Sequence, residues 1–378
     1  MCFLEFYFIL AIICGFNCEY AGHNKPFGSH QDPVGKLIEL DDFPDPGTFF
    51  DDYVIDSQPF IVKKGATKIP AFKLWTDEYL KSKYGFLNVT AEIGKKEDRA
   101  ENLINPTMSV YLDMYKNSDI YMVYDVPRIM MADDLIIPKS LRCGGFLRNL
   151  QLLVMWFSSG GTKSVLHSDS IDNINCLFDG ELKSQVEDES NNWVKNGAYS
   201  KVDVERVDMN IYENFRNIPW WHAIMEKGDC LFIPKGWYHT VWSTGNRNLA
   251  VNFWFAHLLR FDDEDCNNNF IKDDTPLSKV YSDDPKSQRQ RKLEEYRSSL
   301  FEPFIHAEVI NETHFDEFME EAKQYIKEPR EYLNELLKIC DTNHDSAIDW
   351  EEVFQCPIEN IKNFELLFED TEIKRDEL

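Results

Sequence analysis

The sequence has few of the features that mark membrane proteins and nucleic-acid-binding proteins. Beyond the first 20 residues, no apolar run approaches the roughly 20 residues needed to span a bilayer, so we expect no membrane span there. Lysine and arginine number 40 against 66 aspartates and glutamates, which gives a net charge of -26. A surface of this sign repels phosphates and argues against nucleic acid as a partner. The sequence also contains no internal repeat and no Cys-x-x-Cys redox pair.

Short strand-like runs separated by turns fill the middle of the chain. Residues 150–157 form an apolar and aromatic run that ends in a Ser-Ser-Gly-Gly turn. Residues 230–234 form a short strand after a Gly-Asp turn, another strand begins at Thr240, and a further one covers 248–255. This alternation predicts a barrel or jelly roll. With 43% hydrophobic residues, the 378-residue chain can fill one large β domain and a small helical one.

Two histidines and one aspartate have the pattern of a metal site. His167 and Asp169 form a His-x-Asp pair after the 150–161 strand and turn, and His239 follows far downstream between two predicted strands. Two imidazoles and one carboxylate can hold Fe(II) on one face and leave the other face open for chemistry. The sequence therefore predicts a non-haem iron site.

The same His-x-Asp pattern occurs at two other places in the chain. His30 and Asp32 lie in a Gly- and Pro-rich entry segment, whereas His314 and Asp316 lie where a helix is expected to begin. Neither place offers the strand context of a jelly-roll metal site. We interpret both pairs as surface residues.

The order of these motifs resembles the JmjC-domain 2-oxoglutarate oxygenases, particularly the group similar to the asparaginyl hydroxylase that inhibits hypoxia-inducible factor. The motifs are His-x-Asp, Gly-Asp-Cys-Leu-Phe-Ile-Pro at 228–234, Gly-Trp-Tyr-His at 236–239 and Ala-Val-Asn-Phe-Trp at 250–254, with a related entry segment at 58–65. The resemblance covers residues 35–260. It implies a mainly β fold, a double-stranded β-helix or cupin-like jelly roll, in which the triad holds Fe(II) and 2-oxoglutarate is the cosubstrate.

The resemblance also assigns residues to the cosubstrate. Ser164 matches a hydroxyl position, Asn173 and Asn252 match polar positions of the pocket, and Tyr121 is a candidate phenolic partner. For Ser164, Asn252 and Tyr121, an ordinary polar residue of a strand is the alternative interpretation.

The cosubstrate lysine of the family has no counterpart in register. Leu182 stands at its place and Lys183 follows one residue later, so Lys183 is the remaining candidate for binding the far carboxylate. Because strand side chains alternate between faces, Lys183 would point out of the barrel unless a bulge absorbs the slip. Residues 184–192 also lack the apolar alternation of a barrel strand. Divergence, loss of the cosubstrate site and an error in the gene model all remain explanations.

Both ends of the chain predict the lumen of the endoplasmic reticulum. Residues 6–16 are an apolar run of the length of a signal-peptide core, so residues 1–20 are predicted to be a cleaved leader. The chain ends in Arg-Asp-Glu-Leu at 375–378, which is close to the address read by the retrieval receptor. Asn88 and Asn311 begin glycosylation sequons that are usable in this compartment.

Six cysteines remain after removal of the leader, namely Cys143, Cys176, Cys230, Cys266, Cys340 and Cys356. An oxidising compartment permits disulfides between them. Cys176 and Cys230 lie in apolar strand contexts and could equally be buried free thiols. The sequence leaves the pairing open.

The region after residue 260 has a different character. Residues 261–314 are predicted to be a linker with a helix at 285–300, and residues 315–370 to be an EF-hand region whose entering helix covers 315–339. Its loop at 341–352 offers oxygen ligands at the spacing that suits Ca²⁺, from Asp341, Asn343, Asp345, the carbonyl of Ala347, Asp349 and Glu352. Ser346 stands where such loops have glycine, which predicts weak binding. A solvated acidic loop is the alternative, and 263–274 could be a degenerate second hand.

These features predict an Fe(II)- and 2-oxoglutarate-dependent hydroxylase of the endoplasmic reticulum lumen. A protein side chain of the secretory pathway is the expected substrate. The alternative is a catalytically silent luminal protein of the same fold that binds calcium or client proteins, and the misplaced Lys183 favours it.

Overall fold

The computed structural model describes residues 20–94, 103–127, 130–187, 195–196, 199–268, 271–281, 285–301, 304, 307, 309–311, 314 and 329–360. Residues 1–19 of the predicted leader and the whole predicted retrieval signal lie outside these residues. The described helices are α1 (Pro46–Phe49), α2 (Ala71–Leu74), α3 (Asp77–Tyr84), α4 (Met108–Met114), α5 (Asp263–Asn268), α6 (Pro285–Phe301), α8 (Pro329–Cys340) and α9 (Trp350–Gln355). Among the described residues, no helix is long and apolar enough to cross a membrane.

The strands form the body of the molecule. They are β1 (Gly35–Lys36), β2 (Ile38–Leu40), β3 (Phe60–Val62), β4 (Ala91–Ile93), β5 (Leu103–Ile104), β6 (Ile120–Asp125), β7 (Leu150–Ser158), β8 (Asp172–Glu187), β9 (Lys195–Asn196), β10 (Tyr199–Ser200), β11 (Trp220–Met225), β12 (Cys230–Ile233), β13 (Tyr238–Phe255), β14 (Ile310–Asn311) and β15 (Ala347–Ile348). The main sheet runs β2-β3-β12-β8-β13-β7-β6-β4-β5, and β11 joins β8 to β1.

Two long strands wrap this sheet into a jelly roll. β8 pairs with β11, β12 and β13, and β13 pairs with both β7 and β8. Each strand therefore passes from one layer to the other, and side chains of alternate positions line a central cavity. The predicted mainly β, cupin-like jelly roll is confirmed.

The strand predictions hold for β7 and β12 and need two corrections elsewhere. The strands expected at Thr240 and at 248–255 are one strand, β13, with register irregularities after Thr244. β8 continues to Glu187 although its last residues lack an apolar alternation. Backbone pairing with β11 on one side and β13 on the other explains this, because the ladder does not depend on apolar side chains.

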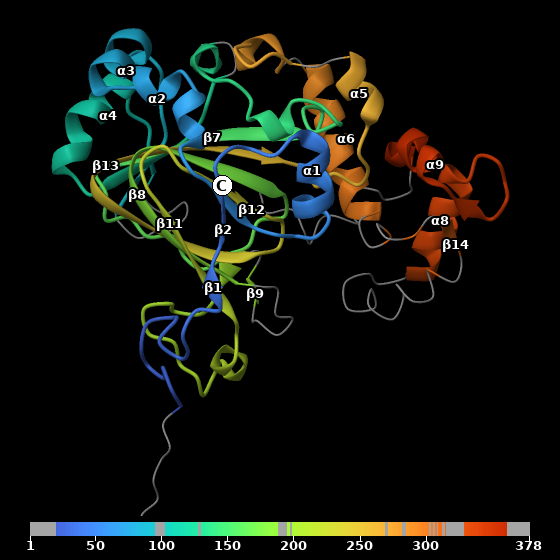
Figure 1. The fold of residues 1–378 in the computed structure, drawn as a ribbon, viewed down its shortest axis with the longest axis horizontal. Coiled ribbons are helices and arrows are strands. Elements are labelled where there is room, and N and C mark those ends of the chain that lie inside the picture. Colours follow the sequence, from blue (N-terminus) through green and yellow to red (C-terminus); the bar gives the residue numbers. More distant parts are fainter. Residues whose placement is uncertain are drawn as a thin grey trace, which may run out of the picture.

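Helices cover one side of the sheet and hold its core. In Figure 1, α2, α3 and α4 gather over the ends of β7, β8 and β13. α3 and α4 begin at threonines whose hydroxyls accept a backbone N–H of the first turn, Thr76 from Tyr79 and Thr107 from Val110. Between helices and sheet lies a large aromatic core in which Phe49 contacts Phe60 and Phe232 edge-on.

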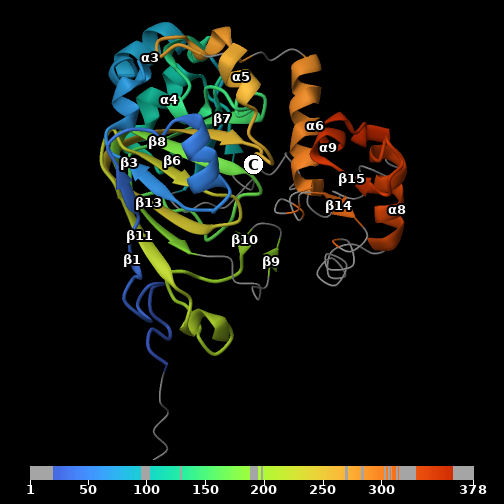
Figure 2. The ribbon, with the colours of Figure 1, turned by 45° about the vertical axis from the view of Figure 1, so that its right-hand side comes forward.

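A small lobe hangs below the barrel, where the N-terminal segment and residues 199–218 lie side by side (Figures 1 and 2). Phe27 packs there against Phe215 and Trp220, and its N–H donates to the carbonyl of Val204. His30 belongs to this lobe and is buried, with Nε2 against the carbonyl of Ile218. The prediction of a surface position for His30 is therefore wrong, because the later segment covers it.

The C-terminal lobe lies beside the barrel and carries the predicted calcium loop (Figure 2). α6 contacts the barrel, where Gln151 donates to the carbonyl of Arg291 and Ser298 to that of His257. The lobe has its own apolar cluster, which includes Phe301, Leu336 and Ile348.

All six described cysteines form disulfides. The pairs are Cys143–Cys266, Cys176–Cys230 and Cys340–Cys356. The alternative that Cys176 and Cys230 are free thiols is thereby corrected. These two cysteines face each other directly on the paired strands β8 and β12, a position that brings their sulfur atoms together.

Candidate metal centre

The three predicted metal ligands converge at one end of the barrel cavity. One ligand atom from each of His167, Asp169 and His239 lies within 4.8 Å of the others. His239 Nε2 is 3.9 Å from Asp169 Oδ2, and the two imidazole centres are 4.2 Å apart. His167 follows the turn after β7, while His239 is the second residue of β13. The backbone N–H of each histidine donates to the carbonyl of the other, at 3.1 and 2.7 Å, which holds the two rings side by side.

The hydrogen bonds of both imidazoles fix the nitrogen that faces the centre. Nδ1 of His167 lies 2.8 Å from the carbonyl of Val165, and Nδ1 of His239 lies 3.0 Å from that of Trp237. A carbonyl only accepts, so Nδ1 carries the proton in each ring and Nε2 carries the lone pair. This is the support that metal-binding histidines receive from their surroundings.

The carboxylate and its loop are also held in place. The amide of Asn173 donates to Asp169 Oδ2 at 3.4 Å, and the carbonyl of Asp169 accepts the N–H of Gly236 at 2.9 Å. Two neutral imidazoles and one carboxylate on one side of a cavity are the donor set of an Fe(II) centre with open positions. The residues present therefore fit the iron that the sequence predicts.

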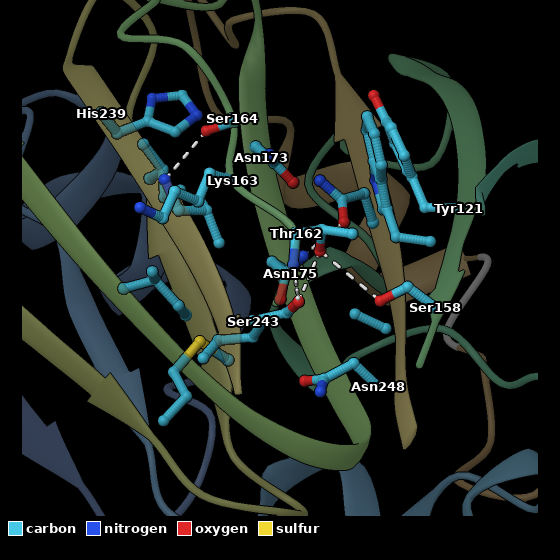
Figure 3. A pocket seen from close by; sticks show the side chains of 18 of the residues that line it. Tyr121, Ser158, Thr162, Lys163, Ser164, Asn173, Asn175, His239, Ser243 and Asn248 are labelled. Carbon is cyan, nitrogen blue, oxygen red and sulfur yellow. Dashed lines mark hydrogen bonds between the residues drawn. The ribbon is translucent and has the colours of Figure 1, made fainter. Parts of the chain in front are cut away.

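A cavity of about 120 Å³ extends from the triad into the barrel. Such a space holds several water molecules or one small organic acid, since about 10–15 Å³ suffices for one water. Figure 3 shows 18 of the side chains that line it. The predicted residues Tyr121, Ser164, Asn173 and Asn252 are all among them.

The contacts of these predicted residues differ. Ser164 Oγ accepts the N–H of Val241 at 2.8 Å, so its hydroxyl is held by the backbone. Asn252 Oδ1 accepts from the amide of Asn175 at 2.5 Å across the paired strands β8 and β13. Tyr121 stacks on Trp156 at the cavity wall.

Sequence reasoning missed four polar residues at the end of the cavity away from the triad. Ser158, Thr162 and Ser243 form a chain of hydroxyls there, and Asn248 lies beside them (Figure 3). A signal was present for Asn248, which is four residues before Asn252 on the same strand and hence on the same face. The same signal was present for Asn175, which also lines the cavity and follows Asn173 by two residues on β8.

Lys183 does not reach the cavity. β13 residues Ala250 and Leu249 pair with Leu177 and Asp179, so β8 carries an extra residue there, a bulge before Gly180. After the bulge, Leu182 points inward and lines the cavity, whereas Lys183 is exposed. The prediction of Lys183 as a cosubstrate ligand is corrected. The bulge turns the side chain of Leu182, and not that of Lys183, toward the inside of the barrel.

The far end of the cavity therefore lacks what is needed to bind the far carboxylate of 2-oxoglutarate. A buried carboxylate needs a cation or several donors. Of the described residues lining the cavity, only Lys163 is cationic, and its ammonium pairs with the carboxylate of Glu205 while its side chain is 43% exposed. The triad end suits iron, but the opposite end offers no buried positive charge among the described residues.

The predicted calcium loop forms a tight acidic turn. Glu352 Oε1 accepts the N–H groups of Thr342 and Asn343, and Asp341 accepts those of Asp345 and Ser346. Ser346 has a φ of 68°, which is the left-handed conformation expected at its place. The last predicted ligands, Asp349 and Glu352, form a capping box at the start of α9.

The partner of this loop is not the acidic stretch at 263–274. β15, inside the loop, pairs antiparallel with β14, and Ile348 lies opposite Ile310. Residues 263–268 instead form helix α5. The suggestion of a degenerate hand at 263–274 is therefore wrong, and the strand inside the 341–352 loop pairs instead with residues 310–311.

The two sequons differ in exposure. Asn88 is exposed, whereas Asn311 is half-buried in β14 and accepts the N–H of His314. Three predicted features lie outside the described residues: the remainder of the second sequon, Asp316 of the third His-x-Asp pair, and residues 315–328 of the helix predicted for 315–339. The last part of that helix is present as α8.

The fold and the triad define a jelly-roll protein with a candidate metal site, and comparison with known proteins agrees with this fold. The cupin-like domain family matches residues 46–261, more than half of the chain, and the chain belongs to this family. Its JmjC homologues are Fe(II)- and 2-oxoglutarate-dependent oxygenases.

Several curated proteins resemble the chain over this region. Lysine-specific demethylase JMJ30 of Arabidopsis thaliana is 27% identical over 231 residues, covering 55% of this chain and 52% of that protein. Lysine-specific demethylase 8 of Xenopus tropicalis is 25% identical over 226 residues, covering 55% and 50%. JmjC domain-containing protein D of Dictyostelium discoideum is 27% identical over 231 residues, covering 51% and 50%. The match spans about half the length of these relatives.

Proposed function

We propose that the protein is an iron-dependent hydroxylase that acts on protein side chains in the endoplasmic reticulum lumen. The observation that carries this proposal is the convergence of His167, Asp169 and His239 at the mouth of the cavity, with both Nε2 lone pairs directed by backbone carbonyls. When bound, an iron ion would supply oxygen activation. The protein's own residues hold it, and Asn173 orients the carboxylate of Asp169.

The choice of hydroxylation and of a protein substrate goes beyond the relatives, whose printed names include lysine demethylases. It rests on the motif resemblance to the asparaginyl hydroxylase group and on the net charge of -26, which disfavours nucleic acid as a partner. The test compares secretory-pathway proteins from cells that express the wild type or Asp169→Ala. We expect some side chains to gain the mass of one oxygen atom only with the wild type. Identical proteomes would contradict the proposal.

The luminal location is a proposal that the cysteines support. All six described cysteines are paired, as is usual in an oxidising compartment and rare in the cytosol. The exposed Asn88 is a usable glycosylation site. We expect a form that lacks residues 375–378 to be secreted, whereas the full chain stays in the cell and carries a glycan that endoglycosidase H removes. Retention of both forms in an unglycosylated state would contradict the location.

We further propose that the 341–352 loop binds Ca²⁺, with the six predicted oxygen ligands and Glu352 as the last of them. The left-handed turn at Ser346 and the β14–β15 ladder support this proposal, since both belong to the geometry of an EF-hand loop. A calorimetric titration of the wild type and Glu352→Ala tests it. Identical isotherms would contradict calcium binding at this loop and would favour the alternative of a solvated acidic loop.

Replacing Ser346 by glycine is expected to raise the calcium affinity by about fivefold. A side chain in the left-handed region costs about 1 kcal/mol, which corresponds to that factor. Ser346→Ala is the matched control, because it removes the hydroxyl and keeps the strain, and its affinity should stay near that of the wild type. Equal affinities for the Gly and Ala variants would show that the turn does not limit binding.

The alternative function, a silent luminal protein that binds calcium or clients, is favoured by one observation. Among the described residues that line the cavity, none supplies a buried cation, and Leu182 stands where the family places its cosubstrate lysine. The two functions differ in one outcome, because a silent protein would leave no oxygen on any protein in the comparison with Asp169→Ala.

A further inference from the structure

The described residues that line the far end of the barrel cavity are uncharged, although the JmjC homologues of the chain use a dicarboxylate as cosubstrate. β13 lines the cavity with two of its parts. The first includes Val241 and Ser243, and the second includes Asn248 and Asn252. Ser243 pairs with Leu182 of β8. The layer opposite the metal centre thus consists of hydroxyls, an amide and an aliphatic side chain.

Three amide oxygens in this cavity are buried without a hydrogen-bond partner among the described residues. They are Oδ1 of Asn173, Asn175 and Asn248. Asn173 and Asn248 each use their amide nitrogen as a donor, toward the carboxylate of Asp169 and the carbonyl of Thr244. Because both of those partners only accept, the amide orientation is settled, and the two oxygens remain as unpartnered acceptors of residues that line the cavity.

An acceptor that is buried without a donor destabilises the protein, so these oxygens favour a ligand or water that donates hydrogen bonds. A second carboxylate cannot donate at neutral pH, and it would stand beside Asn248 Oδ1 without a cation. A hydroxyl or a carboxamide can donate to that oxygen and accept from the hydroxyls of Thr162 and Ser243. The lining therefore matches a neutral polar group.

We propose that the cavity binds a 2-oxo acid whose far end is an uncharged hydrogen-bond donor, in preference to 2-oxoglutarate. The proposal rests on the proposed function, because the 2-oxo acid end is expected to bind at an iron ion held by the triad. Leu182 is the residue that determines the specificity. It closes the far end at the place where a lysine would otherwise neutralise a carboxylate.

Anaerobic calorimetric titration of the Fe(II)-loaded full chain tests this with two probes of equal size. These are 2-oxoglutarate and its neutral carboxamide, 2-oxoglutaramate. We expect the carboxamide to bind at least about tenfold more tightly, since an unpaired buried carboxylate costs more than a neutral amide that is hydrogen-bonded. Tighter binding of 2-oxoglutarate, or failure of both probes to bind iron-loaded protein, would overturn the proposal.

Leu182→Lys reverses the expected order. An ammonium in the cavity can pair with the far carboxylate, and a charge-assisted bond of about 1.5–3 kcal/mol corresponds to a gain of roughly 10- to 100-fold for 2-oxoglutarate. Leu182→Met keeps the size and adds no charge, so it should leave the preference of the wild type unchanged. An equal gain in both variants would contradict the role given to Leu182.

Lys163 is the other source of charge that must be tested. If its ammonium left Glu205 and turned inward, the wild type would bind 2-oxoglutarate tightly and Lys163→Met would lose that binding, which would overturn the proposal. We expect Lys163→Met to bind both probes as the wild type does. Iron uptake is measured first and separately. If folded protein took up no iron, the proposed function would be contradicted, and so would the binding of a 2-oxo acid at the triad.

Discussion

Fe(II) affinity falls by more than about 100-fold when His167 is replaced by alanine. The loss is this large because His167 supplies one of three ligands and its ring is held by Val165 with Nε2 toward the centre. Anaerobic titration with Fe(II), followed by metal analysis of the desalted protein, measures it. The wild type should retain one iron per chain.

His30→Ala is the matched control for this loss. His30 belongs to the same His-x-Asp pattern, but its ring is buried in the N-terminal lobe against Ile218 and Phe27. We expect His30→Ala to retain the iron of the wild type. Retention of iron by His167→Ala, with a circular dichroism spectrum like that of the wild type, would contradict the assignment of the triad.

Asp134→Ala is expected to lower the free energy of unfolding by about 3–5 kcal/mol. The Asp134 carboxylate is buried and accepts four donors, namely Trp75 Nε1 and Tyr79 OH at 3.0 Å, Tyr84 OH at 2.7 Å and Lys83 Nζ at 3.0 Å. Its removal leaves these donors without their acceptor and opens a space between α3 and the loop at 130–134. Urea unfolding followed by fluorescence measures the change.

The neighbouring Asp133→Ala is the control, because Asp133 is exposed and should cost less than about 0.5 kcal/mol. Lowering the pH should also distinguish the two aspartates by its effect on the free energy of unfolding. Burial raises the pKa of Asp134, but hydrogen bonds from Tyr84, Trp75 and Lys83 outweigh it and leave the pKa below its ordinary value. The stabilisation is therefore present above the ordinary pKa and is lost as the pH falls through the lowered one. Equal unfolding curves for the two variants would contradict the role of Asp134.

Much of the site could be predicted from the sequence because its ligands lie next to strong strand signals. The 150–157 run and the 228–234 segment are apolar enough to identify β7 and β12, and they place His167 and His239 at neighbouring strand ends. Once the barrel closes, backbone pairing between these two histidines brings the triad together. Local pattern and tertiary structure agree at this place.

What could not be predicted depends on contacts between distant segments. The faces of Leu182 and Lys183 follow from a bulge that only the pairing of β8 with β13 reveals. The burial of His30 requires the segment that contains Ile218 to fold over it, 188 residues later in the chain.

The disulfides and the predicted calcium loop also depend on contacts between distant segments. Cys176 and Cys230 become partners only because β8 and β12 pair in that register. The segment at 310–311 has no acidic pattern that would mark it as the companion of the 341–352 loop. Its pairing with β15 is a property of the backbone rather than of charge.

The most direct test of the account is the position of iron in the loaded protein. Crystals of the anaerobically loaded full chain should give a single anomalous peak at the iron edge, between Nε2 of His167, Nε2 of His239 and a carboxylate oxygen of Asp169. Density from a ligand with a neutral far end should reach toward Ser243 and Asn248. An iron peak elsewhere, or none at the triad in a folded chain, would contradict the assignment of this site.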